Sequence, residues 1–123
     1  MAFREVGRVE EAIDAHIRDR DLCQVTGDRH GEGMTWHNLA ACLLDAGSAE
    51  EAIEAYGKAL EVYQEFEDCY WAGHALVGLA FVHQDIHDLP GARAHYLRAV
   101  QAFTRANAPA EAAQAQSSAD ALT

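Results

Sequence analysis

The sequence lacks the features that mark membrane-spanning, secreted and disulfide-linked proteins. Its longest apolar run, residues 75–82, is eight residues long, whereas a membrane-spanning helix needs about 20. The opening residues, MAFREVGRVEEAID, contain no apolar core of a secretory signal. The three cysteines form no CxxC pair. The sequence therefore predicts no disulfide framework and a reducing, cytoplasmic location.

Basic residues are also scarce. Nine Lys and Arg stand against twenty Asp and Glu, which gives a net charge of −11. Between residues 30 and 92 the one basic residue is Lys58. Such a surface repels phosphate backbones, so we expect no nucleic-acid partner. A neutral or basic protein suits it better, while the alternative is that the acidic residues only solvate exposed helix faces.

What the sequence does contain is a repeat with a period of forty residues. The segment EEAIDAH at 10–16 returns as EEAIEAY at 50–56. Other recurring sets are Ala12, Ala52 and Ala92; Arg18, Lys58 and Arg98; His16, Tyr56 and Tyr96; and the pairs Leu39-Ala40 and Leu79-Ala80. A fixed period of this length indicates a repeat architecture, in which stacked units share one continuous core.

The segment TGDRHGEGMTWHNLA, residues 26–40, has four ionisable side chains within five positions and three glycines, which is the composition of a catalytic loop. Its copy forty residues later, FEDCYWAGHALVGLA, keeps the aspartate, one glycine and the Leu-Ala pair but none of the reactive side chains. Aspartate is a favoured helix N-cap, which we expect of Asp28 and Asp68. Glycine lets a neighbouring helix approach closely, which we expect at Gly33 and Gly73. The segment is therefore interpreted as a joint between two helices.

Apolar residues spaced near 3.6 positions predict helices throughout. The expected helices cover residues 9–25, 31–46, 49–65, 69–86, 89–105 and 109–122, with a short N-terminal segment at 2–6. Pro90 and Pro109 fall near helix starts, where the missing N–H costs little, and Gly47 follows a helix as a C-cap signal. No alternating run of β-branched residues predicts a strand. The sequence thus predicts an all-α fold in which consecutive helices are antiparallel neighbours.

The recurring positions resemble the tetratricopeptide repeat (TPR) family. The residues at that family's spacing are Leu39, Ala40, Gly47, Ala52, Tyr56 and Ala59, and then Leu79, Ala80, Ala92, Tyr96 and Ala99. The forty-residue period is similar to the longer-repeat subgroup of kinesin light chains, LGN-type adaptors and actinobacterial regulatory arrays. The resemblance implies a right-handed α-solenoid of about six helices in antiparallel pairs. It implies a single domain, 1–123, made of a half repeat at 1–27, full repeats at 28–67 and 68–107, and a capping helix at 108–123.

The resemblance also implies that the first helix of each pair lines a concave groove that holds a peptide. The residues expected to face this groove are Met34, His37, Asn38, Ala41 and Asp45 on one helix and His74, Val77, Phe81, Gln84 and Asp85 on the next. Asn38 is the best single contact because its amide both donates and accepts; an inter-helix hydrogen bond is the alternative. Val77 and Phe81 either form an apolar pocket or pack between repeats. None of the ten residues is Lys or Arg, so the family's clamp for carboxylate tails is not expected.

The first copy has no full helix before its second helix, which should therefore expose an apolar stripe. The stripe consists of Val9, Ala12, Ile13, His16 and Ile17. Two interpretations are open: the chain is a fragment of a longer array, or a second copy of the chain covers the stripe. The Ala-, Gln- and Ser-rich C-terminal segment is instead expected to be a solvating cap.

Residues suited to catalysis or metal binding form no supported set. His83 and His87 are four positions apart, a spacing that would put both rings on one helix face. His87, however, falls at the predicted helix end and no third ligand is fixed, so a solvated histidine near a helix end is the plainer interpretation. Cys42 lies on an apolar face and is expected in the core. The GEG at 31–33 follows no strand, which excludes a dinucleotide-binding fingerprint. We expect no enzyme, no catalytic residue, no metal site and no cofactor.

The sequence thus predicts a protein-interaction scaffold that binds a peptide or partner helix in the concave groove. We expect it to be a module of a larger bacterial regulatory protein in signalling. The alternative is a ligand-sensing regulatory domain that binds a small peptide or metabolite. The expected partner is a neutral or basic protein or peptide, without nucleic acid or membrane. Homo-oligomers are expected through the uncapped N-terminal helix.

Overall fold

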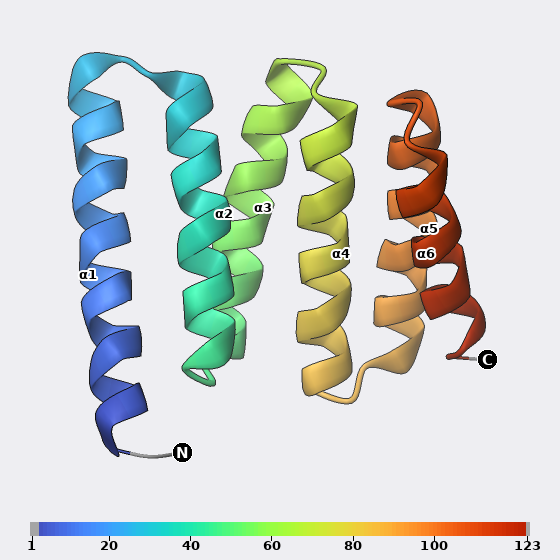
Figure 1. The fold of residues 1–123 in the computed structure, drawn as a ribbon, viewed down its shortest axis with the longest axis horizontal. Coiled ribbons are helices and arrows are strands. Elements are labelled where there is room, and N and C mark those ends of the chain that lie inside the picture. The colour runs from blue at the N-terminus through green and yellow to red at the C-terminus, as the bar shows by residue number, and fades with distance from the viewer. Residues whose placement is uncertain (1–2, 123) are drawn as a thin grey trace.

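The computed structural model describes the backbone of residues 3–122 and the side chains of residues 8–122. The chain forms six helices that run alternately up and down in the order of the sequence (Figure 1). They are α1 (Phe3–Thr26), α2 (Arg29–Asp45), α3 (Ala49–Glu65), α4 (Cys69–Asp85), α5 (Leu89–Arg105) and α6 (Pro109–Asp120). No strand occurs between residues 3 and 122, and the predicted all-α helical solenoid is confirmed.

The first helix is longer than predicted. The sequence indicated a short segment at 2–6 and a separate helix at 9–25, but α1 is continuous from Phe3 to Thr26. Gly7 lies inside it, and a glycine in a helix interior costs only about 1 kcal/mol relative to alanine. Its presence alone therefore does not end the helix. From α2 onward, each predicted boundary lies within two residues of the observed one.

The joints between helices recur every twenty residues, and each joint contains one residue with a positive φ angle. These residues are Gly27 (φ 75°), Gly47 (80°), Glu67 (53°), His87 (63°) and Asn107 (59°). Each lies shortly after a helix end, where a left-handed residue lets the following N–H groups return to the last carbonyls. After Gly47, for example, the N–H of Ser48 donates to the carbonyl of Leu43 at 2.9 Å. The predicted C-cap role of Gly47 is confirmed.

Replacing Glu67 with glycine is expected to stabilise the protein by about 1 kcal/mol. A left-handed conformation costs a residue with a Cβ roughly 1–2 kcal/mol, a penalty that glycine does not carry. Glu67 is exposed and has φ 53°, so no packing is lost. The matched change Gly47→Ala should destabilise the protein by a similar amount. Urea unfolding midpoints test both, and a lower midpoint for Glu67→Gly would contradict the prediction.

Aspartate side chains cap three of the helices. The Oδ1 of Asp28 accepts from the N–H of Gly31 at 3.0 Å, and the Oδ1 of Asp68 accepts from Trp71 at 3.1 Å. Both predicted N-caps are confirmed. Asp88, which the sequence did not single out, does the same for α5 through the N–H of Gly91 at 3.0 Å. A carboxylate at this position satisfies a free donor and also interacts favourably with the helix dipole.

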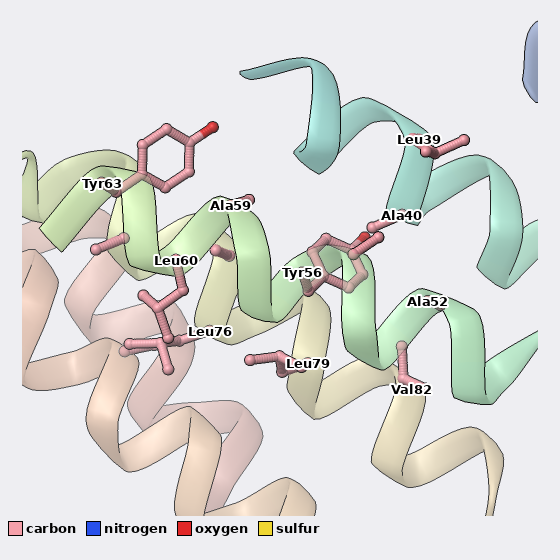
Figure 2. Packing of buried hydrophobic residues seen from close by; sticks show 14 of the residues in the cluster. Leu39, Ala40, Ala52, Tyr56, Ala59, Leu60, Tyr63, Leu76, Leu79 and Val82 are labelled. Atoms are coloured by element: carbon pink, nitrogen blue, oxygen red, sulfur yellow. The ribbon is translucent and has the colours of Figure 1, made fainter. Parts of the chain in front are cut away.

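The core lies along the seams between helices and combines large and small side chains. Figure 2 shows Ala40 of α2 beside Tyr56 of α3, together with Leu39 on α2 and Ala52 and Ala59 on α3, all of which are buried. The pair Leu79 and Ala80 of α4 is buried in the same way one repeat later. The recurring positions therefore occupy equivalent places in the core.

Two of the glycines predicted from the repeat allow close helix contacts. A Cβ added to Gly33 would lie 2.6 Å from Cγ1 of Val62, and one added to Gly73 would lie 2.7 Å from Cε1 of Phe103. Both distances are too short for real atoms, so only glycine fits. The predicted close approach at Gly33 and Gly73 is confirmed.

Alternate helices share one side of the molecule. In Figure 1, α2 crosses in front of α3 and α6 crosses in front of α5. Two of the even-numbered helices, α2 and α4, also contact each other directly. Within residues 3–122, no helix combines the length and the apolar character that a membrane crossing requires.

Candidate functional site

A cavity of about 260 Å³ opens between α4, α5 and α6. It is lined by His74, Val77 and Phe81 of α4, by Tyr96 and Phe103 of α5, and by Glu111, Gln114, Ala115 and Ser118 of α6. The structure thus brings together three of the ten residues predicted to face the groove. Alanine and serine leave room on α6, because their side chains are too short to reach across to α4. We call this cavity the α4–α6 groove.

Phe81 is the most prominent apolar group of the α4–α6 groove. Its side chain is 52% exposed, and its ring meets that of Tyr96 edge to face, with centroids 6.1 Å apart. An aromatic ring held in place on one side and open on the other can bury further apolar surface when a ligand arrives. Val77 packs partly against the core beside it.

The charge of the α4–α6 groove is acidic. Glu111 is the one carboxylate among its described lining residues, and none of them is Lys or Arg. Burial lowers the pKa of His74, with a smaller opposing effect from Glu111, so His74 is neutral at pH 7. The site therefore offers an apolar surface with a single negative charge at its edge.

The corresponding seam between α2 and α4 is filled by rings instead. The His37 ring lies 5.4 Å from that of Tyr56 and 6.0 Å from that of Trp71, edge to face in both cases. Its Nδ1 is buried and has no hydrogen-bond partner among the described residues. Burial, followed by the effect of His74, lowers the pKa of His37 to about 4. His37 is therefore a neutral histidine held between aromatic side chains.

The other predicted groove residues lie outside the lining of the α4–α6 groove. Met34 accepts a hydrogen bond at its Sδ from the hydroxyl of Tyr63 at 3.3 Å. Gln84 accepts one at its Oε1 from the hydroxyl of Tyr96 at 2.6 Å. Asn38, Asp45 and Asp85 are exposed, and Ala41 is half-buried. A role for these residues in binding stays a prediction.

Sequence reasoning missed the contribution of α6, which was interpreted only as a cap. The signal was present in the repeat, because Met34, His74 and Gln114 are spaced at forty residues. Extending the same register past residue 105 places Gln114 on the groove side of α6. This role of α6 was not predicted because the helix is weakly apolar and has few large side chains that would mark the repeat register.

The ionisable residues Asp28, Arg29, His30 and Glu32 take part in separate hydrogen bonds and ion pairs. Asp28 caps α2, the Nε2 of His30 lies 3.3 Å from Oδ2 of Asp68, and Glu32 lies 3.3 Å from the guanidinium of Arg29. Side chains with different partners do not form one reactive centre. In the part of the chain whose side chains are described, no three His, Cys, Asp or Glu side chains gather closely enough to hold a metal ion.

The predicted N-terminal stripe divides into two parts. Ile13 and Ile17 pack against the core, whereas Val9, Ala12 and His16 are half-buried without belonging to it. Leu22 and Val25, which the sequence analysis did not include, are 61% and 84% exposed. The apolar surface that α1 exposes therefore extends beyond the predicted stripe to Leu22 and Val25.

The repeat register explains the open face. Ala12 and His16 stand forty residues before Ala52 and Tyr56, which α3 buries against α2. Among the described residues, no helix precedes α1 and takes the place of α2. By the repeat register, this face of α1 is equivalent to the face of α3 that packs against α2.

A comparison with known families identifies a match over the first half of the chain. The model of the family described as tetratricopeptide repeat matches residues 1–65, just over half of the chain, from the first residue to the end of α3. No curated protein matches the sequence.

Proposed function

The chain belongs to the tetratricopeptide repeat family, and from that premise we propose that it is a scaffold whose α4–α6 groove binds a peptide or a partner helix. Tetratricopeptide repeats are a non-enzymatic fold that generally mediates protein–protein interaction. The family leaves open where this chain binds and what it binds, and the geometry and charge of the groove support the proposal on both points.

The observation that carries the proposal is the half-exposed ring of Phe81 at the edge of the α4–α6 groove. Binding energy at protein interfaces concentrates in a few large side chains that fill pockets. A ligand side chain placed in the groove would contact Phe81, Val77 and the short side chains of α6. The volume of about 260 Å³ suits one or two side chains of a peptide rather than a whole cofactor.

The charge of the groove supports a neutral or basic partner. Glu111 lies in its lining, and the exposed Asp45 and Asp85 extend the acidic surface along α2 and α4. A basic side chain next to an apolar one would satisfy both the carboxylate and the ring. An acidic peptide would be repelled on this side.

Peptides selected on the chain from a phage-displayed library should bind the Phe81→Ala variant at least tenfold more weakly. The loss of one large aromatic contact corresponds to roughly 2 kcal/mol. Phe66→Ala is the matched control, because Phe66 is 51% exposed and lies outside the groove. Fluorescence anisotropy measures both. Equal affinity for Phe81→Ala and the parent chain would contradict the proposal.

The cellular context is part of the same proposal. We infer a module of a larger bacterial regulatory protein, which the resemblance to actinobacterial regulatory arrays supports, and a cytoplasmic location, which the three free cysteines support. A ligand-sensing domain stays the alternative. It would show a thermal shift with a small metabolite instead of affinity for peptides.

We further propose that the open face of α1 is covered by a second copy of the chain when the chain is isolated. The mean mass from light scattering should then rise with protein concentration. The double variant Ala12→Glu and His16→Glu should remain monomeric, because two added carboxylates would meet those of the other copy. A parent chain that keeps its monomer mass at high concentration would rule this out.

A further inference from the structure

A second and larger cavity, of about 510 Å³, lies between α3, α4 and α5. The α4 residues that line it stand at positions 69, 72 and 76, whereas those that line the α4–α6 groove stand at 74, 77 and 81. Successive residues turn by about 100° around a helix, which sets these two groups on opposite faces of α4. The second cavity, here called the arginine cavity after its contents, therefore opens on the side away from the groove.

The repeat register shows why this cavity exists. The three α4 residues Cys69, Ala72 and Leu76 stand forty positions after Arg29, Glu32 and Trp36 of α2. The earlier seam, between α1 and α3, holds those larger side chains and a smaller cavity of about 210 Å³. Three truncations, from Arg to Cys, from Glu to Ala and from Trp to Leu, leave the later seam hollow.

At the earlier seam, the charged groups are paired within the chain. The guanidinium of Arg29 binds the carboxylate of Glu65 through two contacts, of 2.7 and 3.0 Å, and it lies 3.3 Å from Glu32. Two cations lie over the Trp36 ring, with Arg20 4.9 Å and Lys58 5.4 Å from its centroid. Every cation at this seam therefore has an anionic or aromatic neighbour.

At the later seam, the equivalent groups have lost those neighbours. Arg105 stands forty residues after Glu65, and Arg98 forty residues after Lys58; both line the arginine cavity. Within residues 8–122, no ion pair involves either guanidinium. Two cations without ion pairs in one cavity stand out in a chain with a net charge of −11.

The carboxylates at the edge of the arginine cavity do not replace the lost partners. Asp68 accepts from the N–H of Trp71 and lies 3.3 Å from Nε2 of His30, so it serves the start of α4. Glu67 stands on the preceding turn with φ 53°. These acids restrict the cavity to a ligand that carries few negative charges, because a long acidic run would meet them.

We propose that the arginine cavity docks a segment of a protein partner that carries two acidic side chains about 10 Å apart. Arg98 and Arg105 are seven residues apart, two helical turns, and at about 1.5 Å per residue this sets their backbones about 10 Å apart along α5. Guanidinium groups bind carboxylates through two parallel hydrogen bonds, and such charge-assisted bonds are strong. The volume lies in the range of known ligand sites. The arginine cavity is proposed to bind an acidic ligand, whereas the α4–α6 groove is proposed to bind a neutral or basic one. Neither proposal depends on the other.

The test uses a fluorescent helical peptide with glutamates at positions i and i+7 on an Ala/Gln background. Fluorescence anisotropy should show binding that the double variant Arg98→Gln and Arg105→Gln weakens at least tenfold. The matched control is Arg18→Gln, which changes the equivalent arginine of α1, forty residues before Lys58 and outside the cavity. A peptide with glutamine at both positions should bind at least tenfold more weakly, and added salt should weaken binding of the glutamate peptide. Circular dichroism should show unchanged helix content in every variant.

Three results would overturn the inference: no binding of the glutamate peptide, equal binding by the double arginine variant, or equal binding of the glutamine peptide. Displacement of the glutamate peptide by inorganic phosphate at a concentration equal to that of the peptide would also overturn the inference, because the cavity would then be a general anion site. Phe81→Ala should leave binding of the glutamate peptide unchanged, and the double arginine variant should keep its affinity for groove peptides. The two sites can therefore fail separately.

Discussion

Replacing Tyr63 with alanine is expected to lower the free energy of unfolding by about 3–5 kcal/mol. Tyr63 is fully buried, with 0% of its surface exposed, and its ring lies among those of His30, His37 and Trp71. Truncation would open a hole at the meeting point of α2, α3 and α4. A domain of this size is stabilised by about 5–15 kcal/mol in total, so the variant would be marginal. Urea unfolding followed by circular dichroism measures the loss.

Tyr63→Phe is the matched control for this prediction. The Tyr63 hydroxyl makes only long contacts, 3.5 Å to the carbonyl of Gly33 and 3.3 Å to Sδ of Met34. Forty residues later the repeat has Phe103, also buried, so a ring without a hydroxyl fits the equivalent position. We expect a change of less than about 1 kcal/mol. Equal losses in the free energy of unfolding for Tyr63→Ala and Tyr63→Phe would show that packing of the ring does not stabilise the core.

The second large effect is a loss of stability in weak acid. Burial lowers the pKa of His37 from 6.5 to about 4, so between these values the unfolded chain binds a proton that the folded chain does not. The free energy of unfolding therefore falls as the pH drops from 6.5 to 4 and is highest above 6.5. A shift of this size corresponds to about 3 kcal/mol at and below pH 4. Burial also lowers the pKa of His74 and of His95, which adds to the effect in the same direction.

The variant His37→Phe isolates this effect. A phenylalanine keeps the ring beside Tyr56 and Trp71 but has neither a proton to bind nor the buried Nδ1 that lacks a partner. We expect stability at pH 7 to be equal or higher and the slope between pH 6.5 and 5 to be shallower. Unfolding curves at half-unit pH steps would show this. An identical slope in the parent and the variant would mean that His37 does not stay neutral when folded.

The forty-residue period made most of the fold predictable. Each recurring residue has one local role, since Asp28 and Asp68 cap helices, Gly33 and Gly73 permit close contacts, and Gly47 ends a helix. These roles depend on neighbours within a turn or on the adjacent helix, and a sequence pattern records such neighbours directly. The joint at residues 26–40 was recognised for the same reason.

The two cavities could not be predicted from the sequence pattern, because they depend on the space that short side chains leave between packed helices. The α4–α6 groove is open because α6 presents small residues such as Ala115 and Ser118 toward Phe81. The arginine cavity is open because Cys69 and Ala72 are shorter than their counterparts in α2. A repeat alignment shows which residues differ, but the space left behind follows only when the helices are in place.

The same limit applies to α1. Its continuity through Gly7 depends on the helical residues on both sides, which the sequence interpretation divided into two segments. The exposure of Leu22 and Val25 depends on which face of α1 meets α2. The helix α1 has more apolar residues than its contact with α2 can bury. The sequence pattern therefore did not predict which face of α1 is buried.

The most direct test of the proposed scaffold is an NMR titration of the labelled chain with a groove peptide selected from the library. The account predicts that backbone amide shifts change around the α4–α6 groove, at His74 and Phe81 of α4 and Gln114 of α6, and remain unchanged around Arg98 and Arg105. Changes confined to α1, or to the α3–α5 side, would contradict it.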